Sequence, residues 1–101
     1  MIVVMNRFSV TVGREADFEE AFKNRAGLID GMPGFLGLDM LRPSAPGGVF
    51  ISMSRWASME AFEGWTKSEA FRKAHGKRHE GMFQGHPQLE IFEVFDSTME
   101  A

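Results

Sequence analysis

Three side chains set among apolar residues are the first candidates for chemistry. Trp65 and His75 belong to the run 61–75, and Asn6 lies near the start of the chain. An imidazole on an otherwise apolar helix face is a candidate ligand for haem iron, and a nearby indole can shape the environment of that haem. The NH2 group of Asn6 is a candidate hydrogen-bond donor to a bound ligand.

Each of these side chains also has a purely structural interpretation. His75 follows Phe71 by four residues, so a helix places both on one face, and a core histidine bonded to a carbonyl would explain it when it is taken alone. Trp65 taken alone is a core aromatic, and Trp56 at the end of a predicted strand is interpreted as structural. A backbone hydrogen bond explains Asn6 as readily as a ligand contact does.

Two further constellations lie close to His75. His75 and His79 have the i, i+4 spacing that can place two imidazoles on one metal, but no third ligand completes such a site convincingly. Lys73, Lys77 and Arg78 form a small basic patch. This patch is interpreted as a solvated face or as a partner for haem propionates or another small anion.

The composition limits the class of protein. The chain has 101 residues, which predicts a single domain over 1–101. A net charge of -3 argues against a nucleic-acid partner, and the lack of cysteine excludes disulfides, thiolate metal sites and cysteine nucleophiles. No apolar run approaches the roughly 20 residues that span a bilayer, and signal-peptide features are missing. We therefore expect a soluble cytoplasmic protein without a membrane partner.

The periodicity predicts the elements that must position these residues. Strands are expected at 2–10, 35–42, 49–56 and 89–95, and Asn6 shares the first strand's face with Ile2, Val4 and Phe8. Helices are expected over 14–30 and 58–65, with a second helical segment running from Ser68 toward Lys77.

This order, β-α-β-β-α-β, predicts an α+β protein with the ferredoxin-like split βαβ arrangement. Its antiparallel sheet would carry helices on one face only. Because Val3 and Met5 make the opposite face apolar as well, we expect a homodimer that packs sheet against sheet as a dimeric α+β barrel.

At Asn6, Trp65 and His75 the chain resembles the antibiotic biosynthesis monooxygenase superfamily, over nearly its whole length. The segment 56–62, and Trp65 followed by Ser68 and Phe71, resemble positions shared by many members. The combination of Asn6, Trp65 and His75 is closest to the Isd-type haem-degrading monooxygenases. Phe22 also resembles an aromatic residue that lines their haem pocket.

The resemblance implies a role for each residue. His75 would be the proximal iron ligand, and Asn6 would hydrogen-bond on the distal side. Trp65 would press on a ruffled haem, and Phe22 would line the haem pocket. Haem would be both substrate and prosthetic group, oxidised with O2 and electrons from an external reductase. Two alternatives stay open: a cofactor-free monooxygenase acting on a quinol or polyphenol with His75 as general base, and a non-catalytic haem-binding dimer.

Overall fold

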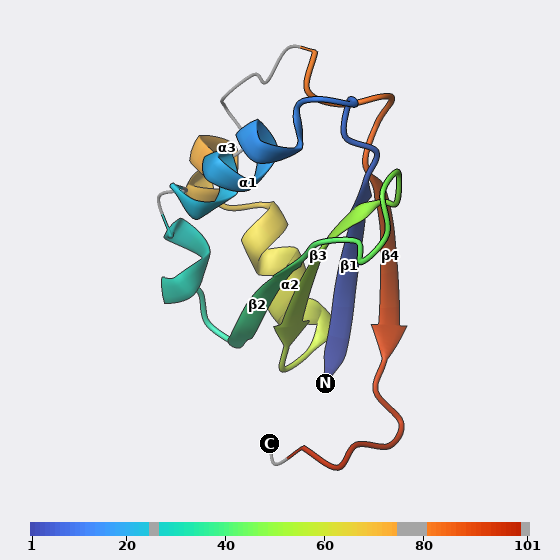
Figure 1. Cartoon of the computed structure of the whole chain (residues 1–101). Helices are drawn as coiled ribbons and strands as arrows, with labels where there is room; N and C mark the ends of the chain where they lie inside the picture. The colour runs from blue at the N-terminus through green and yellow to red at the C-terminus, as the bar shows by residue number, and fades with distance from the viewer. Residues whose placement is uncertain (25–26, 75–80, 100–101) are drawn as a thin grey trace.

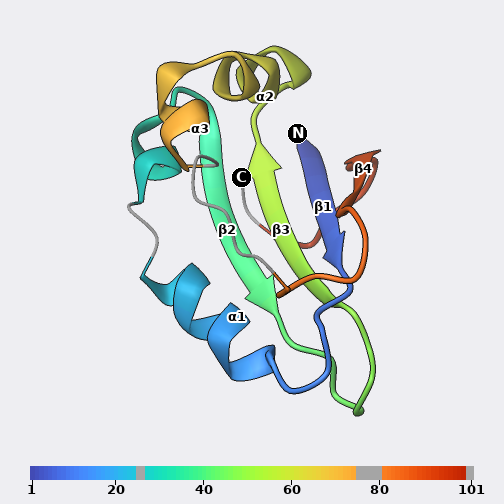
Figure 2. The same ribbon diagram turned by 90° about the horizontal axis from the view of Figure 1, so that it is seen from above.

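The computed structural model describes residues 1–24, 27–74 and 81–99, which form one four-stranded antiparallel sheet with helices on one face (Figures 1 and 2). The strand order is β2-β3-β1-β4. This is the predicted ferredoxin-like α+β arrangement. The strands are β1 (Ile2–Phe8), β2 (Phe35–Leu41), β3 (Phe50–Trp56) and β4 (Gln88–Glu93); the α-helices are α1 (Glu15–Lys23), α2 (Met59–Thr66) and α3 (Glu69–Ala74).

The first helix is shorter than the sequence predicts. A single helix over 14–30 was expected, whereas α1 ends at Lys23 and a separate 3₁₀ helix covers Leu28–Gly31. Gly27, which precedes the 3₁₀ helix, has a φ of 69°, a left-handed conformation that interrupts a right-handed helix. The prediction of one continuous helix over 14–30 was therefore wrong.

The second helical region is divided as predicted. The Ser58 hydroxyl accepts a hydrogen bond from the Ala61 N–H at 3.2 Å and begins α2. The Ser68 hydroxyl accepts from the Phe71 N–H at 3.0 Å and donates to the Trp65 carbonyl at 2.7 Å. Ser68 therefore joins the end of α2 to the start of α3. The expected continuation of α3 toward Lys77 lies outside the described residues.

Two apolar clusters pack between the sheet and the helices. One gathers around Trp56, and the other around Phe18, both almost fully buried. Trp56 donates its indole N–H to the Ser54 hydroxyl at 3.1 Å, which confirms its structural interpretation. The first cluster contains Ile2, Val4, Trp56, Phe62 and Trp65; the second contains Phe8, Phe18, Phe50 and Met82.

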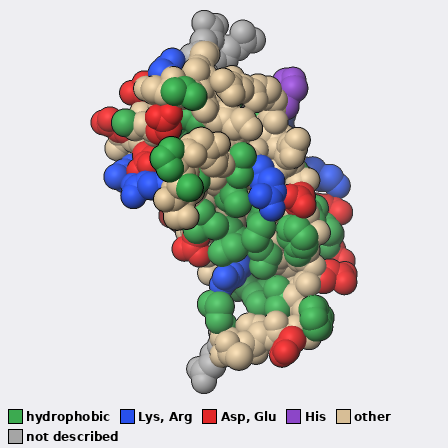
Figure 3. All heavy atoms as spheres, turned by 45° about the vertical axis from the view of Figure 1, so that its right-hand side comes forward, with side chains coloured by type: hydrophobic (Ala, Val, Ile, Leu, Met, Phe, Trp, Pro, Cys, Tyr) green, Lys and Arg blue, Asp and Glu red, His purple; other side chains and the backbone are tan. Residues whose placement is uncertain are grey.

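Strand β4 lies at the edge of the sheet and is exposed along its whole length. Leu89 and Phe92 are 52% and 43% exposed, although they project to opposite faces of the strand. Figure 3 brings the right-hand side of Figure 1 forward and shows hydrophobic side chains gathered on this side of the molecule. Among the residues described, no helix is long and apolar enough to cross a bilayer.

Candidate active-site cavity

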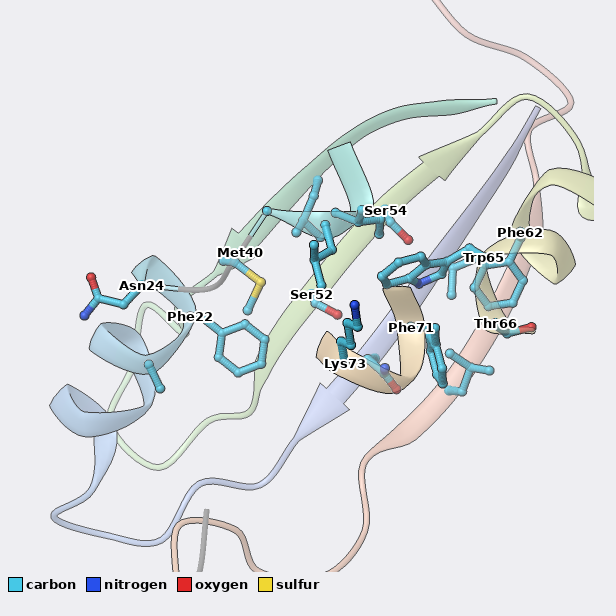
Figure 4. A pocket seen from close by; sticks show the side chains of 18 of the residues that line it. Phe22, Asn24, Met40, Ser52, Ser54, Phe62, Trp65, Thr66, Phe71 and Lys73 are labelled. Carbon is cyan, nitrogen blue, oxygen red and sulfur yellow. The ribbon is translucent and has the colours of Figure 1, made fainter. Parts of the chain in front are cut away.

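A cavity of about 820 Å³ separates the inner face of the sheet from the helices (Figure 4). Its lining comes from all four strands, the three α-helices and the 3₁₀ helix, so segments distant in the sequence build it together. Ligand sites typically measure about 300 to 1,000 Å³ and carry a few polar groups in an apolar lining. The size of this cavity suits a drug-sized or cofactor-sized ligand.

One row of residues that runs straight across the sheet forms part of the cavity floor. Met40 on β2 pairs with Ser52 on β3, Ser52 pairs with Asn6 on β1, and Asn6 pairs with Leu89 on β4. All four line the cavity. Directly opposed side chains share a face, so the antiparallel register places the hydroxyl and the amide side by side between two apolar residues.

Aromatic side chains close the two ends of the cavity. Figure 4 shows Phe22 beside Met40 at one end, and Phe62, Trp65 and Phe71 at the other. The Phe22 ring is itself fixed by packing, with its centroid 4.7 Å from that of Phe18. Rigid apolar end walls of this kind favour a flat apolar ligand between them.

Opposite charges line the cavity from two different helices. Lys73 belongs to α3, whereas Asp17 and Glu20 belong to α1, and all three line it. Within the part of the chain that the structure describes, Lys73 makes no ion pair. An anionic group on a ligand would therefore be drawn toward α3 and repelled from α1.

A smaller cavity of about 430 Å³ adjoins the first and shares Phe22, Leu38 and Met40 with it. At its edge the Arg42 guanidinium donates two hydrogen bonds to the Glu19 carboxylate, one of them from Nε at 2.8 Å. This guanidinium holds the pKa of the Glu19 carboxyl below its ordinary value, by hydrogen bonding first and by charge second.

Three of the four residues singled out in the sequence line the same cavity. Asn6, Phe22 and Trp65 come from β1, α1 and α2. His75, together with Lys77, Arg78 and His79, lies outside the described residues. Across residues 1–24, 27–74 and 81–99, no group of three His, Cys, Asp or Glu side chains is placed to hold a metal ion.

The surroundings of Asn6 distinguish between its two interpretations, a backbone hydrogen bond and a ligand contact. The side chain is half-buried, yet within the described residues its amide makes no hydrogen bond to backbone or side chain. Among the described residues, every fully buried side-chain nitrogen or oxygen has a hydrogen-bond partner. The Asn6 amide atoms have none there, so they are not fully buried, and Asn6 lines the cavity. This favours a ligand contact over a backbone bond.

The sequence reasoning missed Ser52 and Met40. The signal was present in the alternation of β3, because Ser52 shares a face with Phe50, Ser54 and Trp56, which all turn inward. Two serines on the buried face of a strand indicate either a hydrogen-bonded pair or a polar strip facing a cavity. Here Ser54 bonds to Trp56, and Ser52 faces the cavity.

The chain is similar in sequence to known proteins. A family model described as antibiotic biosynthesis monooxygenase matches residues 1–77. A heme-degrading monooxygenase from Bacillus cereus (strain B4264) is 43% identical over 84 residues, which cover 80% of this chain and 75% of that one. A heme-degrading monooxygenase from Bacillus thuringiensis (strain Al Hakam) is 42% identical over the same shares.

Solved structures show the same architecture. The heme degrader MhuD from Mycobacterium tuberculosis, with two hemes bound in its active site, has a TM-score of 0.84 and 30% identity over 98% of this chain and all of that one. SnoaB, a cofactor-independent oxygenase from Streptomyces nogalater, has a TM-score of 0.73 and 22% identity, and covers 98% of this chain and 97% of its own. This second likeness concerns the fold alone.

Proposed function

We propose that this protein, which belongs to the antibiotic biosynthesis monooxygenase family, is an oxygen-dependent haem-degrading monooxygenase whose substrate is haem. The observation that carries the proposal is the meeting of Asn6, Phe22 and Trp65 at one cavity of about 820 Å³. The similarity to heme-degrading monooxygenases at 43% identity supports it.

The cavity suits the shape and polarity of haem. A flat macrocycle would lie between the Phe22 and Trp65 ends, over a floor that is apolar at its margins and polar at its centre. Lys73 would meet the propionates, because it is a cation of the cavity lining that makes no ion pair among the described residues. Burial of the apolar ring surface would supply most of the binding free energy.

His75 is proposed as the iron ligand. The described part of α3 ends at Ala74, and Phe71 and Lys73 of this helix already line the cavity. His75 follows this helix directly in the sequence. A neutral imidazole is the usual protein ligand of haem iron, and a proximal histidine leaves the opposite side of the ring to small molecules.

The remaining residues would orient the ring and exclude water. Asn6 would donate its amide hydrogen bond from the sheet side, and Phe22 would bound the ring edge. Trp65 is only 5% exposed and is held by the first apolar cluster, so it can press on the ring without yielding. The iron would supply the oxygen chemistry, with electrons from an external donor such as a reductase.

A homodimer is proposed as the working form. The helices leave β4 uncovered on both faces, and Leu89, Ile91 and Phe92 are each more than a third exposed. A second copy packed sheet against sheet would cover the outer face of β4, on which Phe92 lies; Leu89 and Ile91 share the inner face with Asn6 and Val4. Sedimentation equilibrium should give twice the chain mass, and Phe92→Asp should shift the equilibrium toward the monomer.

A haem titration followed by reduction tests the function. The Soret band of added haemin should shift and saturate near one haem per chain, and His75→Ala should abolish the shift. Ascorbate or a reductase under air should then bleach the band and release iron. Haem that stays intact with a complete reductant would select the non-catalytic haem-binding dimer. Absence of haem binding, combined with oxygen uptake on a quinol, would select the cofactor-free monooxygenase.

A further inference from the structure

We propose that Ser52 is a second hydrogen-bonding residue of the cavity floor, which acts with Asn6 on the ligand face that meets the sheet. The inference rests on the proposed function, because it takes haem as the ring that covers this floor. It concerns what the floor selects: a small polar ligand on the sheet side of the iron.

The position of Ser52 follows from the strand register. Ser52 and Asn6 are direct partners in the antiparallel pair of β3 with β1, and both line the cavity. Opposed side chains on one face of such a pair have Cβ atoms about 4.5 to 5.5 Å apart. One small ligand can therefore reach both groups, and Figure 4 shows the Ser52 hydroxyl at the floor between the aromatic ends.

Ser52 differs from the other hydroxyl groups of the lining. The Ser54 hydroxyl accepts the Trp56 indole N–H, and the Thr66 hydroxyl donates to the Glu63 carbonyl at 3.0 Å. The Ser52 hydroxyl, like the Asn6 amide, has no hydrogen-bond partner among the described residues. Two adjacent polar groups that have no hydrogen-bond partner within residues 1–24, 27–74 and 81–99 therefore face the same space.

The apolar neighbours confine this polarity to one spot. Met40 and Leu89 continue the row on either side, so the polar strip is only two residues wide. A ring that covers the floor removes its water, and polar groups left without partners oppose binding. The covered pair therefore requires a small hydrogen-bonding ligand, or a retained water, between the ring and the sheet.

Cyanide binding to the ferric haem complex tests this role without turnover. Ser52→Thr and Ser52→Val form a matched pair, since they have the same shape and differ in the hydroxyl group. We expect Ser52→Val to weaken cyanide binding about three- to tenfold, the value of one hydrogen bond, and Ser52→Thr to stay within about twofold of the wild type. Haem affinity, measured by Soret titration, should change little in either variant.

The outcomes separate this inference from the proposed function. Equal cyanide affinities for the Thr and Val variants, whether both unchanged or both weakened, would overturn the role of Ser52 and leave the proposed function standing. A wild-type chain that binds no haem would overturn the proposed function and this inference with it. Circular dichroism melting checks folding, and Ser52→Ala replaces the Val variant if that variant does not fold. Ser44→Ala, in the exposed loop between β2 and β3, is the surface control and should leave cyanide binding unchanged.

Discussion

Trp65 on α2 and Phe71 on α3 pack edge to face, with ring centroids 5.4 Å apart and planes inclined at 83°. Both rings line the cavity. The Ser68 hydroxyl, which bridges the Trp65 carbonyl and the Phe71 N–H, fixes the turn between them. The orientation of α3 relative to α2 is therefore set by this pair of rings and by Ser68.

Removal of the Phe71 ring should loosen α3 and the cavity together. Phe71→Ala removes a half-buried ring and its aromatic contact, so we expect a loss of about 2 kcal/mol in the free energy of unfolding. Haem affinity should fall as well, whereas Phe71→Leu should keep most of both. Urea unfolding and Soret titration of the two variants measure these effects. Unchanged haem affinity in Phe71→Ala would contradict a positioning role for α3.

Lys73→Ala should weaken haem binding in a salt-dependent way. The amino group stands at the cavity without a described ion-pair partner, so its attraction for propionates should be strong at low ionic strength and screened at high salt. Lys67→Ala is the matched control, because Lys67 is exposed and does not line the cavity. Equal haem affinities for the two variants at low salt would place the propionates elsewhere.

Gly34→Ala should destabilise the fold more than Gly47→Ala does. Both glycines have left-handed φ angles, 79° and 82°, but only at Gly34 would a new Cβ lie 2.5 Å from the Ala61 Cβ. We expect Gly47→Ala to cost about 1 kcal/mol and Gly34→Ala to cost about 1 to 3 kcal/mol more, through overpacking of α2 against the turn before β2. Thermal unfolding of both variants measures the difference, and equal costs would show that α2 can shift away.

The Glu19–Arg42 pair should give a small, pH-dependent contribution to stability. The folded-state pKa of Glu19 lies below its ordinary value of 4.5, so the contribution is present above that value and is lost as the pH falls through the folded pKa. Arg42→Gln should therefore be less stable than the wild type at pH 7 and equally stable in acid. The Arg42 side chain is exposed and Glu19 is partly exposed, so the difference should shrink in high salt. Urea unfolding at several pH values measures the difference. Urea is the suitable denaturant because guanidinium chloride is a salt and would screen the ion pair.

The sequence was sufficient for the fold because local signals agreed with one another. The apolar alternation of β1, the caps at Ser58 and Ser68, and the element order all indicated the observed sheet and helices. The exception was 14–30, where the apolar spacing continued past Gly27 although the backbone there turns left-handed. Periodicity reports which face is apolar but does not report a change in backbone direction.

Only part of the candidate site could be predicted from the sequence. Asn6, Phe22 and Trp65 were chosen for their types and for the family resemblance, and they line one cavity. Ser52 and Met40 were not chosen, because their role depends on cross-strand register and on the distance between helices and sheet. Both are tertiary quantities that spacing along the chain does not contain.

The two faces of β3 make this strand intolerant of a change in length. Ser52 and Ser54 face inward, whereas Ile51, Met53 and Arg55 face outward toward the surface assigned to a second copy. Insertion of one residue early in β3 would exchange these sets from that point onward. Methionine would then stand on the cavity floor and serine on the outer surface. A single frame-preserving insertion would thus impair ligand selection and self-association at once, while a similar insertion in the exposed loop 43–48 would leave both intact.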